Sequence, residues 1–328
     1  MIDVAVLVTG GLGYIGSHTA VALAQGGADV VLLDNLRNSE EGAYGRVQEL
    51  AGVGMPFYRA DIGDEEELGR IIKKEGIRVV LHFAGLKAVG ESSKIPLEYY
   101  RNNVGGTISL LQACVRGGVE GFVFSSSATV YDSSQPTPFA EGSKMAATNP
   151  YAYTKLMLEQ VIRDTVGLKS VILRYFNPVG AHPSGIIGEA PRGIPNNLMP
   201  YICQAATGQL PRLQVFGTDY DTPDGSCIRD YIHVQDLARG HILAMERMRE
   251  GAAVYNLGTG RGTSVLEMIA SFEKATGVAV PFIATKRREG DAPISVACVE
   301  KAQRDLDFRA ELDIEAMCRD AWNYQTKN

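Results

Sequence analysis

Tyr151 and Lys155 are the residues of this chain whose types and spacing point most directly to chemistry. They lie four positions apart behind Asn149 and Pro150, which are typical of a helix cap and a first helical turn. We therefore expect both side chains on one face of a helix. A free phenol has a pKa of about 10, but neighbouring positive charge favours its phenolate, so this pair could accept a proton from a hydroxyl group. Taken alone, a tyrosine and a lysine at this spacing are more often a surface contact.

Three consecutive hydroxyl side chains, Ser125–Ser127, follow an apolar run upstream of this pair. If that run is a strand, they lie at its carboxyl end, where a parallel sheet offers side chains to ligands. We expect Ser127 to hold a substrate oxygen or to relay its proton. Spacing does not decide among the three serines, and a plain strand-end turn is the alternative.

A glycine motif near the start of the chain predicts a nucleotide site. Gly10, Gly13 and Gly16 fit the pattern G-x-x-G-x-x-G between an apolar strand and a helical pattern. Glycines permit the tight turn and let the backbone N–H groups at the helix start approach a pyrophosphate. Eighteen residues later, Asp34 ends the next apolar run, where its carboxylate could accept both ribose hydroxyls and repel a ribose phosphate. The motif thus favours NAD over NADP, a preference that Arg37 could soften.

The elements that must position these residues alternate along the first half of the chain. Short apolar runs rich in β-branched residues are separated by longer helical patterns, as in a parallel sheet covered on both faces. The expected strands are residues 4–9, 30–34, 79–83, 121–125 and 171–174, with a late one at 254–257. We predict an α/β fold with a Rossmann-type doubly wound parallel sheet, whose ligands lie beyond the carboxyl ends of its strands.

The composition of the chain changes after residue 176, where glycine and proline become frequent. We expect a NAD-binding Rossmann domain over residues 1–176, rejoined by about residues 228–262. Residues 177–227 and 263–328 are expected to form a smaller C-terminal substrate-binding region.

Composition argues against several other classes of protein. The 328 residues carry 32 basic and 38 acidic side chains, without a block of like charge, which argues against nucleic acid or an anionic membrane as partner. No apolar run is long enough to cross a bilayer, and the N-terminal residues do not resemble a signal peptide. The five cysteines lack a Cys-x-x-Cys pair and the five histidines lack ligand spacing, so we expect a cytoplasmic protein without a metal site or disulfides.

Longer strings narrow the interpretation. They are residues 9–17, 82–92, 125–131, 173–185, 193–201, 229–234 and 287–291. Together with the glycine motif and the Tyr-x-x-x-Lys pattern, they resemble the UDP-glucose 4-epimerases of the extended short-chain dehydrogenase/reductase superfamily, nearly from end to end. This resemblance implies a reversible, NAD-dependent C4 epimerisation of UDP-hexoses through a 4-keto intermediate. Tyr151 would take the proton of the sugar 4-hydroxyl, Lys155 would hold the nicotinamide ribose and depress the tyrosine pKa, and Ser127 would bridge to the sugar.

The resemblance also implies two sets of contact residues. The cofactor set is Gly10, Gly13, Tyr14, Ile15, Gly16, Asp34, Asn35, Asn38, Asp61, Ile62, Phe83, Ala84, Gly85, Lys87, Asn102, Ser125, Tyr151, Lys155 and Tyr175. The UDP-sugar set is Ser127, Tyr151, Asn177, Asn197, Leu198, Gln214, Phe216, Arg229, Arg288, Asp291 and Ser295. Two arginines in the second set suit a diphosphate, which calls for planar, permanently charged donors.

Three positions depart from the family pattern. Gly105 stands where asparagine is frequent and could remove a cofactor-side hydrogen bond, and Asp132 replaces a glycine in a slightly shortened segment. Ser295 occupies the position that is tyrosine in members restricted to glucose and galactose. Because a serine leaves room for a 2-acetamido group, we expect UDP-GlcNAc and UDP-GalNAc to be interconverted as well.

Two alternative functions fit the sequence less well. A nucleotide-sugar 4,6-dehydratase would carry an acid pair where this chain has Ala128 and Thr129, and a non-catalytic NAD-binding regulator would usually lose the tyrosine or the lysine.

The helical stretches 97–114 and 153–166 hold more apolar residues than one sheet face needs. In the resembling family two such helices form a dimer interface, so we expect a homodimer.

Overall fold

The computed structural model describes residues 4–191, 195, 197–288 and 290–328, and the chain forms two compact units. The first unit comprises the chain up to residue 130 together with residues 145–174 and 238–255. The second unit comprises residues 131–144, 175–237 and 256–328. The chain therefore passes several times from one unit to the other.

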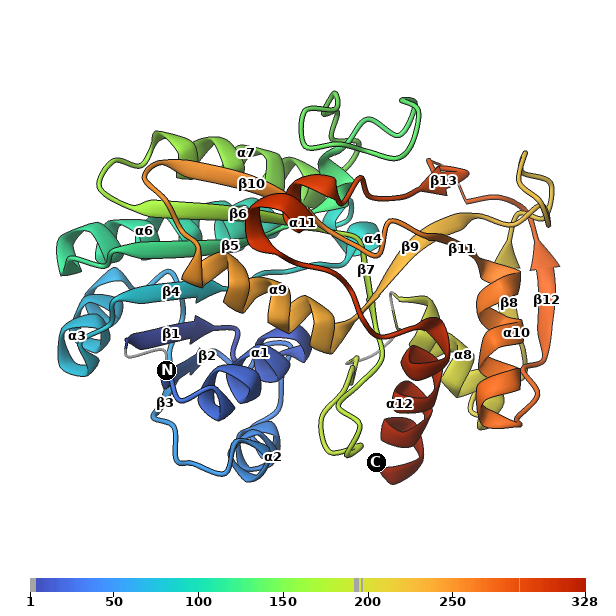
Figure 1. Ribbon diagram of the computed structural model, residues 1–328, viewed down its shortest axis with the longest axis horizontal. Helices are drawn as coiled ribbons and strands as arrows, with labels where there is room; N and C mark the ends of the chain where they lie inside the picture. Colours follow the sequence, from blue (N-terminus) through green and yellow to red (C-terminus); the bar gives the residue numbers. More distant parts are fainter. Residues whose placement is uncertain (1–3, 192–194, 196, 289) are drawn as a thin grey trace. The chain divides into compact units, whose positions relative to one another are not determined.

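A twisted sheet forms the centre of the first unit (Figure 1). Among the described residues its seven strands are β1 (Ala5–Thr9), β2 (Asp29–Asp34), β3 (Phe57–Arg59), β4 (Val79–His82), β5 (Gly121–Ser127), β6 (Lys169–Tyr175) and β10 (Ala252–Leu257). Their order is β10-β6-β5-β4-β1-β2-β3, and β1 pairs in parallel with both β2 and β4. The order reverses beside β1, which is the topological switch point where a doubly wound sheet binds its ligand. The predicted Rossmann-type fold and the late strand's return to the sheet are confirmed.

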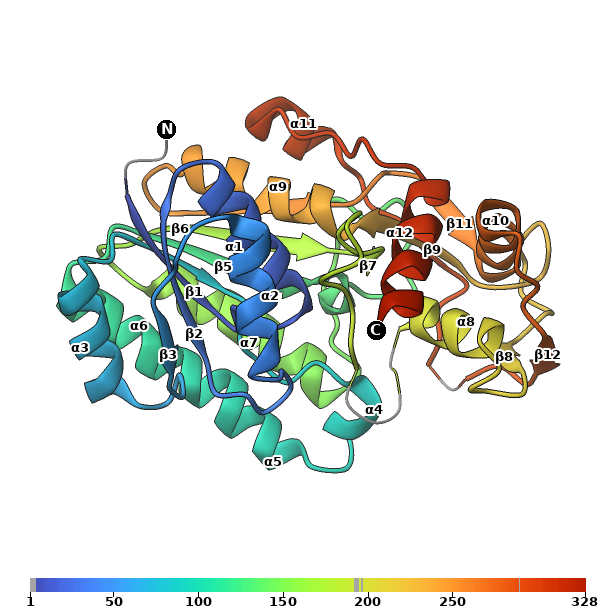
Figure 2. The same ribbon diagram turned by 90° about the horizontal axis from the view of Figure 1, so that it is seen from below.

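Helices cover both faces of this sheet because its strands are apolar on both sides (Figure 2). Helices α3 (Glu65–Glu75), α6 (Gly106–Gly117) and α7 (Pro150–Asp164) pack one face through a single apolar cluster that includes Leu68, Leu110, Leu158 and Phe122. Helices α1 (Tyr14–Gln25) and α9 (Val234–Glu246) lie on the opposite side of the sheet, with α2 (Gly42–Ala51) against α1. The core thereby fixes the strand ends that carry the polar residues.

An irregular helical run precedes α6. It passes from α4 (Val89–Ser92) through α5 (Pro96–Tyr99) into a six-residue π-helix, Tyr100–Gly105, before α6 begins. A π-helix accommodates an extra residue in a helical turn and is frequently found at functional sites. The sequence pattern predicts only a continuous helical stretch here.

The second unit is built around its own apolar cluster, which includes Ile202, Met268, Phe272 and Cys318. Strand β9 (Ile228–His233) pairs with β7 (Asn177–Val179), β11 (Gly262–Ser264) and β13 (Ile294–Ser295), and β8 (Leu213–Phe216) pairs with β12 (Phe282–Thr285). Its helices are α8 (Leu198–Ala206), α10 (Val265–Thr276), α11 (Glu300–Leu306) and α12 (Ile314–Lys327). Helix α10 begins at a capping box formed by Ser264 and Glu267, as the sequence pattern from Ser264 onward leads one to expect.

The two units differ from the predicted domains in three places, the smallest of which is that residues 175–176 belong to the second unit. Residues 131–144, which the prediction assigns to the Rossmann domain, belong to the second unit. They do so because Tyr131 bonds to Asn256 and the backbone of Phe139 pairs with that of Val296. The segment that rejoins the first unit is residues 238–255, which is shorter than the predicted 228–262, because β9 and β11 pair with strands of the second unit.

Candidate active site

Helix α7 carries the Tyr-x-x-x-Lys pattern on a buried face. The Asn149 side chain accepts a hydrogen bond from the Ala152 N–H at 3.0 Å, and Pro150 occupies the first turn, so the predicted cap and helix start are both present. Tyr151 and Lys155 are buried, and four residues bring them to the same side of the helix. The geometry therefore contradicts the alternative of a surface contact for this pair.

Ser127 is the serine that interacts with Tyr151. Its oxygen accepts hydrogen bonds from the N–H and the hydroxyl of Thr129 at 3.2 and 3.0 Å, which leaves its own proton to donate. Burial raises the pKa of Tyr151, and a hydrogen bond from Ser127 acts in the opposite direction. The Ser127 hydroxyl is thus placed to donate a hydrogen bond to the phenol oxygen of Tyr151 and to favour its phenolate.

Lys155 is oriented by the backbone of β5. Its Nζ donates to the Ser125 carbonyl oxygen at 2.7 Å and lies 4.8 Å from the ring centre of Phe124. Burial lowers the pKa of Lys155 to about 8, and the charge of Glu159 partly opposes this. The Nζ lies 5.9 Å from the ring centre of Tyr151. Burial is the largest influence on the pKa of Tyr151, which it raises. The expected lowering of the tyrosine pKa by Lys155 stays a prediction.

The glycine motif forms a turn into which side chains do not fit. Gly10 has φ +67°, and a Cβ there would lie 2.7 Å from the backbone nitrogen of Ala84. A Cβ on Gly16 would collide with the Gly10 carbonyl oxygen. Helix α1 starts immediately afterwards, with no side-chain cap at Gly13 and no acidic residue in its first turn. Its N-terminal N–H groups therefore suit the pyrophosphate of a dinucleotide.

Asp34 is fixed at the end of β2 by its surroundings. Its carboxylate accepts hydrogen bonds from the Leu12 N–H at 3.1 Å and from the Ser39 hydroxyl at 2.7 Å. The Leu36 N–H also bonds to Oδ1 at 2.9 Å, so the remaining acceptor site is on Oδ2, where a ribose hydroxyl could bind. Arg37 is engaged by Glu98 at 2.5 Å, which reduces its availability to soften the preference for NAD.

Asn103 is a residue of this region that the sequence analysis missed. It lies in the π-helix and is buried, and its side-chain amide bonds to the N–H and the carbonyl of Leu86 and to the Thr154 hydroxyl. It joins the segment after β4 to helix α7. In the sequence it is the second of two adjacent asparagines, and nothing in that pattern marks it as buried. Glu159, Thr129 and Thr9 were missed as well.

The predicted cofactor residues of the first unit follow the carboxyl ends of successive strands or the helices behind them. Gly10, Gly13, Tyr14, Ile15 and Gly16 follow β1; Asp34, Asn35 and Asn38 follow or end β2; Asp61 and Ile62 follow β3; Phe83, Ala84, Gly85 and Lys87 follow β4; Asn102 is in the π-helix; Ser125 is on β5, as is the catalytic candidate Ser127; Tyr151 and Lys155 are on α7. Strand order brings these ends to one edge of the sheet. His82, at the end of β4, is buried between the hydroxyls of Thr9 and Thr107, and burial lowers its pKa to about 3.

The second unit contains Tyr175 and most of the predicted UDP-sugar residues. Asn177 lies on β7, Asn197 and Leu198 start α8, Gln214 and Phe216 lie on β8, Arg229 is on β9, Arg288 and Asp291 follow β12, and Ser295 is on β13. Arg229 forms an ion pair with Asp291 and is the register partner of Ser295 across β9 and β13. The guanidinium of Arg288 lies over the ring of Phe216, 3.9 Å from its centre.

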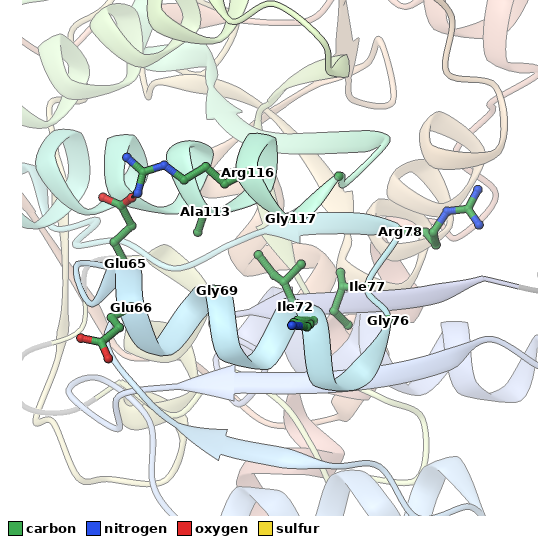
Figure 3. A pocket seen from close by; sticks show the side chains of 12 residues that line it. Glu65, Glu66, Gly69, Ile72, Gly76, Ile77, Arg78, Ala113, Arg116 and Gly117 are labelled. Atoms are coloured by element: carbon green, nitrogen blue, oxygen red, sulfur yellow. Dashed lines mark hydrogen bonds and ion pairs between the residues drawn. The ribbon is translucent and has the colours of Figure 1, made fainter.

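Some residues and one groove of the chain lie outside the candidate site as the structure describes it. Within the matched strings, residues 193, 194, 196 and 289 lie outside the described residues. A groove of about 550 Å³ between α3 and α6 is lined by Glu65, Lys73, Arg116 and neighbouring residues (Figure 3), none of which belongs to the predicted sets. In the part of the chain that the structure describes, no three His, Cys, Asp or Glu side chains are grouped to hold a metal ion. No described helix has the length and apolar character needed to span a membrane.

Comparisons with protein families, with related sequences and with solved structures agree on one family. The profile of the NAD dependent epimerase/dehydratase family matches residues 6–258. The UDP-glucose 4-epimerase of Bacillus subtilis (strain 168) is 52% identical over 330 residues, covering 99% of this chain and 97% of that protein.

Two solved structures are informative. The UDP-glucose 4-epimerase of Stenotrophomonas maltophila, with bound NAD and formylated UDP-arabinopyranose, is 49% identical with a TM-score of 0.97, covering 99% of this chain and 98% of that one. The UDP-Glc/GlcNAc 4-epimerase of Campylobacter jejuni is 33% identical with a TM-score of 0.87, covering 99% of this chain and 100% of that one.

Proposed function

Because the chain belongs to the UDP-glucose 4-epimerases of the NAD dependent epimerase/dehydratase family, we propose that it inverts UDP-hexoses at C4, with NAD as its cofactor. Its substrates are UDP-galactose and UDP-glucose and also UDP-GalNAc and UDP-GlcNAc. The observation that carries the proposal is the buried arrangement of Tyr151, Lys155 and Ser127 at the carboxyl end of β5.

The proposed mechanism uses these three side chains for proton transfer and for holding the cofactor. When bound, NAD supplies a hydride acceptor and a positively charged ring. Tyr151 accepts the proton of the sugar 4-hydroxyl. The Thr129 hydrogen bonds fill the acceptor sites of the Ser127 oxygen and leave its proton free, so Ser127 holds the phenol or sugar oxygen by donating that proton in a hydrogen bond. After the 4-keto sugar turns over, Tyr151 returns the proton to the oxygen, and the net reaction consumes no oxidant. Lys155 holds the nicotinamide ribose.

The charge of Lys155 predicts an alkaline limit to activity. Its pKa of about 8 lies below the ordinary value of 10.5, so the ammonium that would hold the ribose is lost as pH rises through about 8. We expect NAD retention and kcat to fall above that pH, measured by cofactor content after gel filtration and by initial rates. The unfolded lysine stays protonated up to about 10.5, so the free energy of unfolding of the apoprotein should rise with pH over the same window. A limit at pH 10 or higher would contradict the assignment.

The arginines of the second unit are proposed to bind the diphosphate. We expect Arg288→Met to raise the KM for UDP-galactose about tenfold with little change in kcat, because a hydrogen bond to a charged group contributes about 1.5–3 kcal/mol. The matched control is Arg287→Met, since the Arg287 guanidinium is bonded to Asp219 and is not in the predicted set. Equal effects of the two substitutions in steady-state kinetics would remove Arg288 from the site.

Ser295 is the proposed determinant of sugar range. It is half-buried and faces Arg229 across the β9–β13 pair, next to a predicted diphosphate ligand. The name of the Campylobacter jejuni relative, which acts on both Glc and GlcNAc substrates, supports an extended range within this fold.

We also propose a cytoplasmic homodimer. The five cysteines are free thiols, as in a reducing compartment. Helices α5, α6 and α7 expose apolar side chains at Leu97, Ile108, Tyr153 and Met157, which a second copy could cover. Light scattering should give twice the chain mass of 35.4 kDa.

The experiment that tests the function is product analysis after incubating the purified protein with UDP-galactose and UDP-GalNAc separately, without added NAD. Formation of both C4 epimers is the expected result. Elimination of water from the sugar would favour the 4,6-dehydratase. No reaction even with added NAD would favour the non-catalytic NAD-binding regulator.

A further inference from the structure

Three consecutive serines at the end of β5 each meet a different residue of α7. The partners on the helix are spaced by four residues, so they lie along one face of α7 facing the strand. The pairs are Ser127 with Tyr151, the Ser125 carbonyl with Lys155 at 2.7 Å, and the Ser126 hydroxyl with Glu159 at 2.6 Å. The first two pairs belong to the proposed mechanism, whereas the third has no role in it.

The third pair, Ser126 and Glu159, belongs to a buried cluster of charged residues. Glu159 is fully buried, and its carboxylate accepts hydrogen bonds from Arg174 of β6 at 2.8 and 2.5 Å. Arg163 of α7 donates to the same carboxylate at 3.0 Å. Arg174 is 1% exposed. One carboxylate therefore ties helix α7 to two neighbouring strands of the sheet.

A buried ion pair is an inefficient means of stabilising a fold, because well-packed apolar residues of the same volume often serve as well or better. Beside Glu159, α7 also packs on the sheet through the apolar residues Leu158 and Ile162, and one turn earlier the Lys155 Nζ donates to the Ser125 carbonyl. Apolar contacts are non-directional and leave the axial position of a helix weakly determined. A bidentate arginine and a serine hydroxyl are directional, so they can set the position of α7 along β5.

We propose that Glu159 is a positioning residue for the proposed epimerisation, fixing α7 against Ser126 and Arg174 so that Tyr151 and Lys155 meet their partners on β5. The proposal rests on the proposed function, since it assigns Glu159 a role in that same site. One helical turn separates Glu159 from Lys155, and two turns separate it from Tyr151, so a shift of the helix would displace both reacting groups together.

The charge of Glu159 provides a readout that a purely structural role would not move. Burial acts to raise its pKa, but the hydrogen bonds and charge of Arg174 outweigh this and lower it, so the carboxylate is ionised. Glu159 in turn raises the pKa of Lys155 against the effect of burial. The other titratable groups around Lys155 are Tyr151 on the same helix, His82 on β4, which is neutral at physiological pH, and His241 of α9, which lies 3.3 Å from the Ser125 hydroxyl.

The test compares three variants of the NAD-bound protein. We expect Glu159→Gln to lower kcat for UDP-galactose about ten- to a hundredfold, with KM changed less than about threefold, because a displacement of about 1 Å has effects of this size. It should also move the alkaline limit of NAD retention to lower pH. Ser126→Ala keeps the ion pair and should lower kcat about three- to tenfold without moving that limit. Ile172→Ala truncates a buried apolar residue of β6 and controls for lost stability.

The outcomes separate this proposal from the proposed function. Wild-type kcat in both Glu159→Gln and Ser126→Ala at temperatures well below their Tm, or effects equalled by Ile172→Ala, would overturn the positioning role. If Glu159→Gln does not fold, the kcat of Ser126→Ala decides. If the wild-type protein does not epimerise UDP-galactose, the proposed function fails, and the pH limit of NAD retention still tests the influence of Glu159 on Lys155.

Discussion

Replacement of Tyr151 by phenylalanine should lower kcat for UDP-galactose about a thousandfold while NAD stays bound. Proton transfer by a positioned side chain contributes about 10²–10⁴-fold, and phenylalanine has no hydroxyl group to accept the proton. The ring itself packs with Leu86 and Tyr99, and phenylalanine preserves this packing. Initial rates and the absorbance of retained cofactor measure the two quantities separately.

The chain provides a matched control for this substitution. Tyr153 lies two residues further along α7 and is 46% exposed, so Tyr153→Phe removes the same atom from the opposite side of the helix. It should leave kcat and KM unchanged. Retention of more than a tenth of wild-type kcat by Tyr151→Phe would exclude Tyr151 as the proton acceptor.

Replacement of Ser295 by tyrosine should separate the two classes of sugar. We expect activity on UDP-GalNAc to fall about a hundredfold, because forcing a ring against a 2-acetamido group costs about 1–3 kcal/mol or more. Activity on UDP-galactose, which has only a hydroxyl at C2, should stay within about threefold of the wild type. The ratio of kcat/KM for the two substrates is the quantity to measure.

The substitution of Ser295 by tyrosine also has a matched control at the same position of β13. Ser295→Ala keeps a small side chain opposite Arg229 and should leave both activities in place. An equal loss on both sugars in Ser295→Tyr would mean that the substitution disturbs β13 as a whole, and the determinant of sugar range would have to be sought elsewhere in the second unit.

The sequence predicts the sheet and the helix that carries the chemistry because each has a local cause. Apolar runs with β-branched residues identify the strands, and Asn149 and Pro150 mark the start of α7. The glycine spacing likewise predicts the turn after β1, which the positive φ of Gly10 confirms. These features depend on residues within one turn or one strand of each other.

The contacts that distinguish one serine from another depend on residues far apart in the chain. Spacing leaves Ser125–Ser127 equivalent, whereas the packing of α7 on β5 gives each a different partner. From the sequence alone, Glu159 would be interpreted as a solvated charge on an amphipathic helix. The structure places Arg174, fifteen residues later in the chain, beside it. The assignment of residues 131–144 to the second unit depends on the distant Asn256 in the same way.

The π-helix at Tyr100–Gly105 makes the length of the chain matter more than its residue types in this segment. Loss of the one extra residue would close this turn to ordinary helical geometry without turning α6, because a π-helix absorbs that residue between two α-helical stretches. Leu110 and Cys114 of α6 would keep their packing against the sheet, whereas the wide turn that brings Asn103 to Leu86 would be lost. A one-residue deletion here should therefore leave the fold intact and disturb the link from Asn103 to the segment after β4.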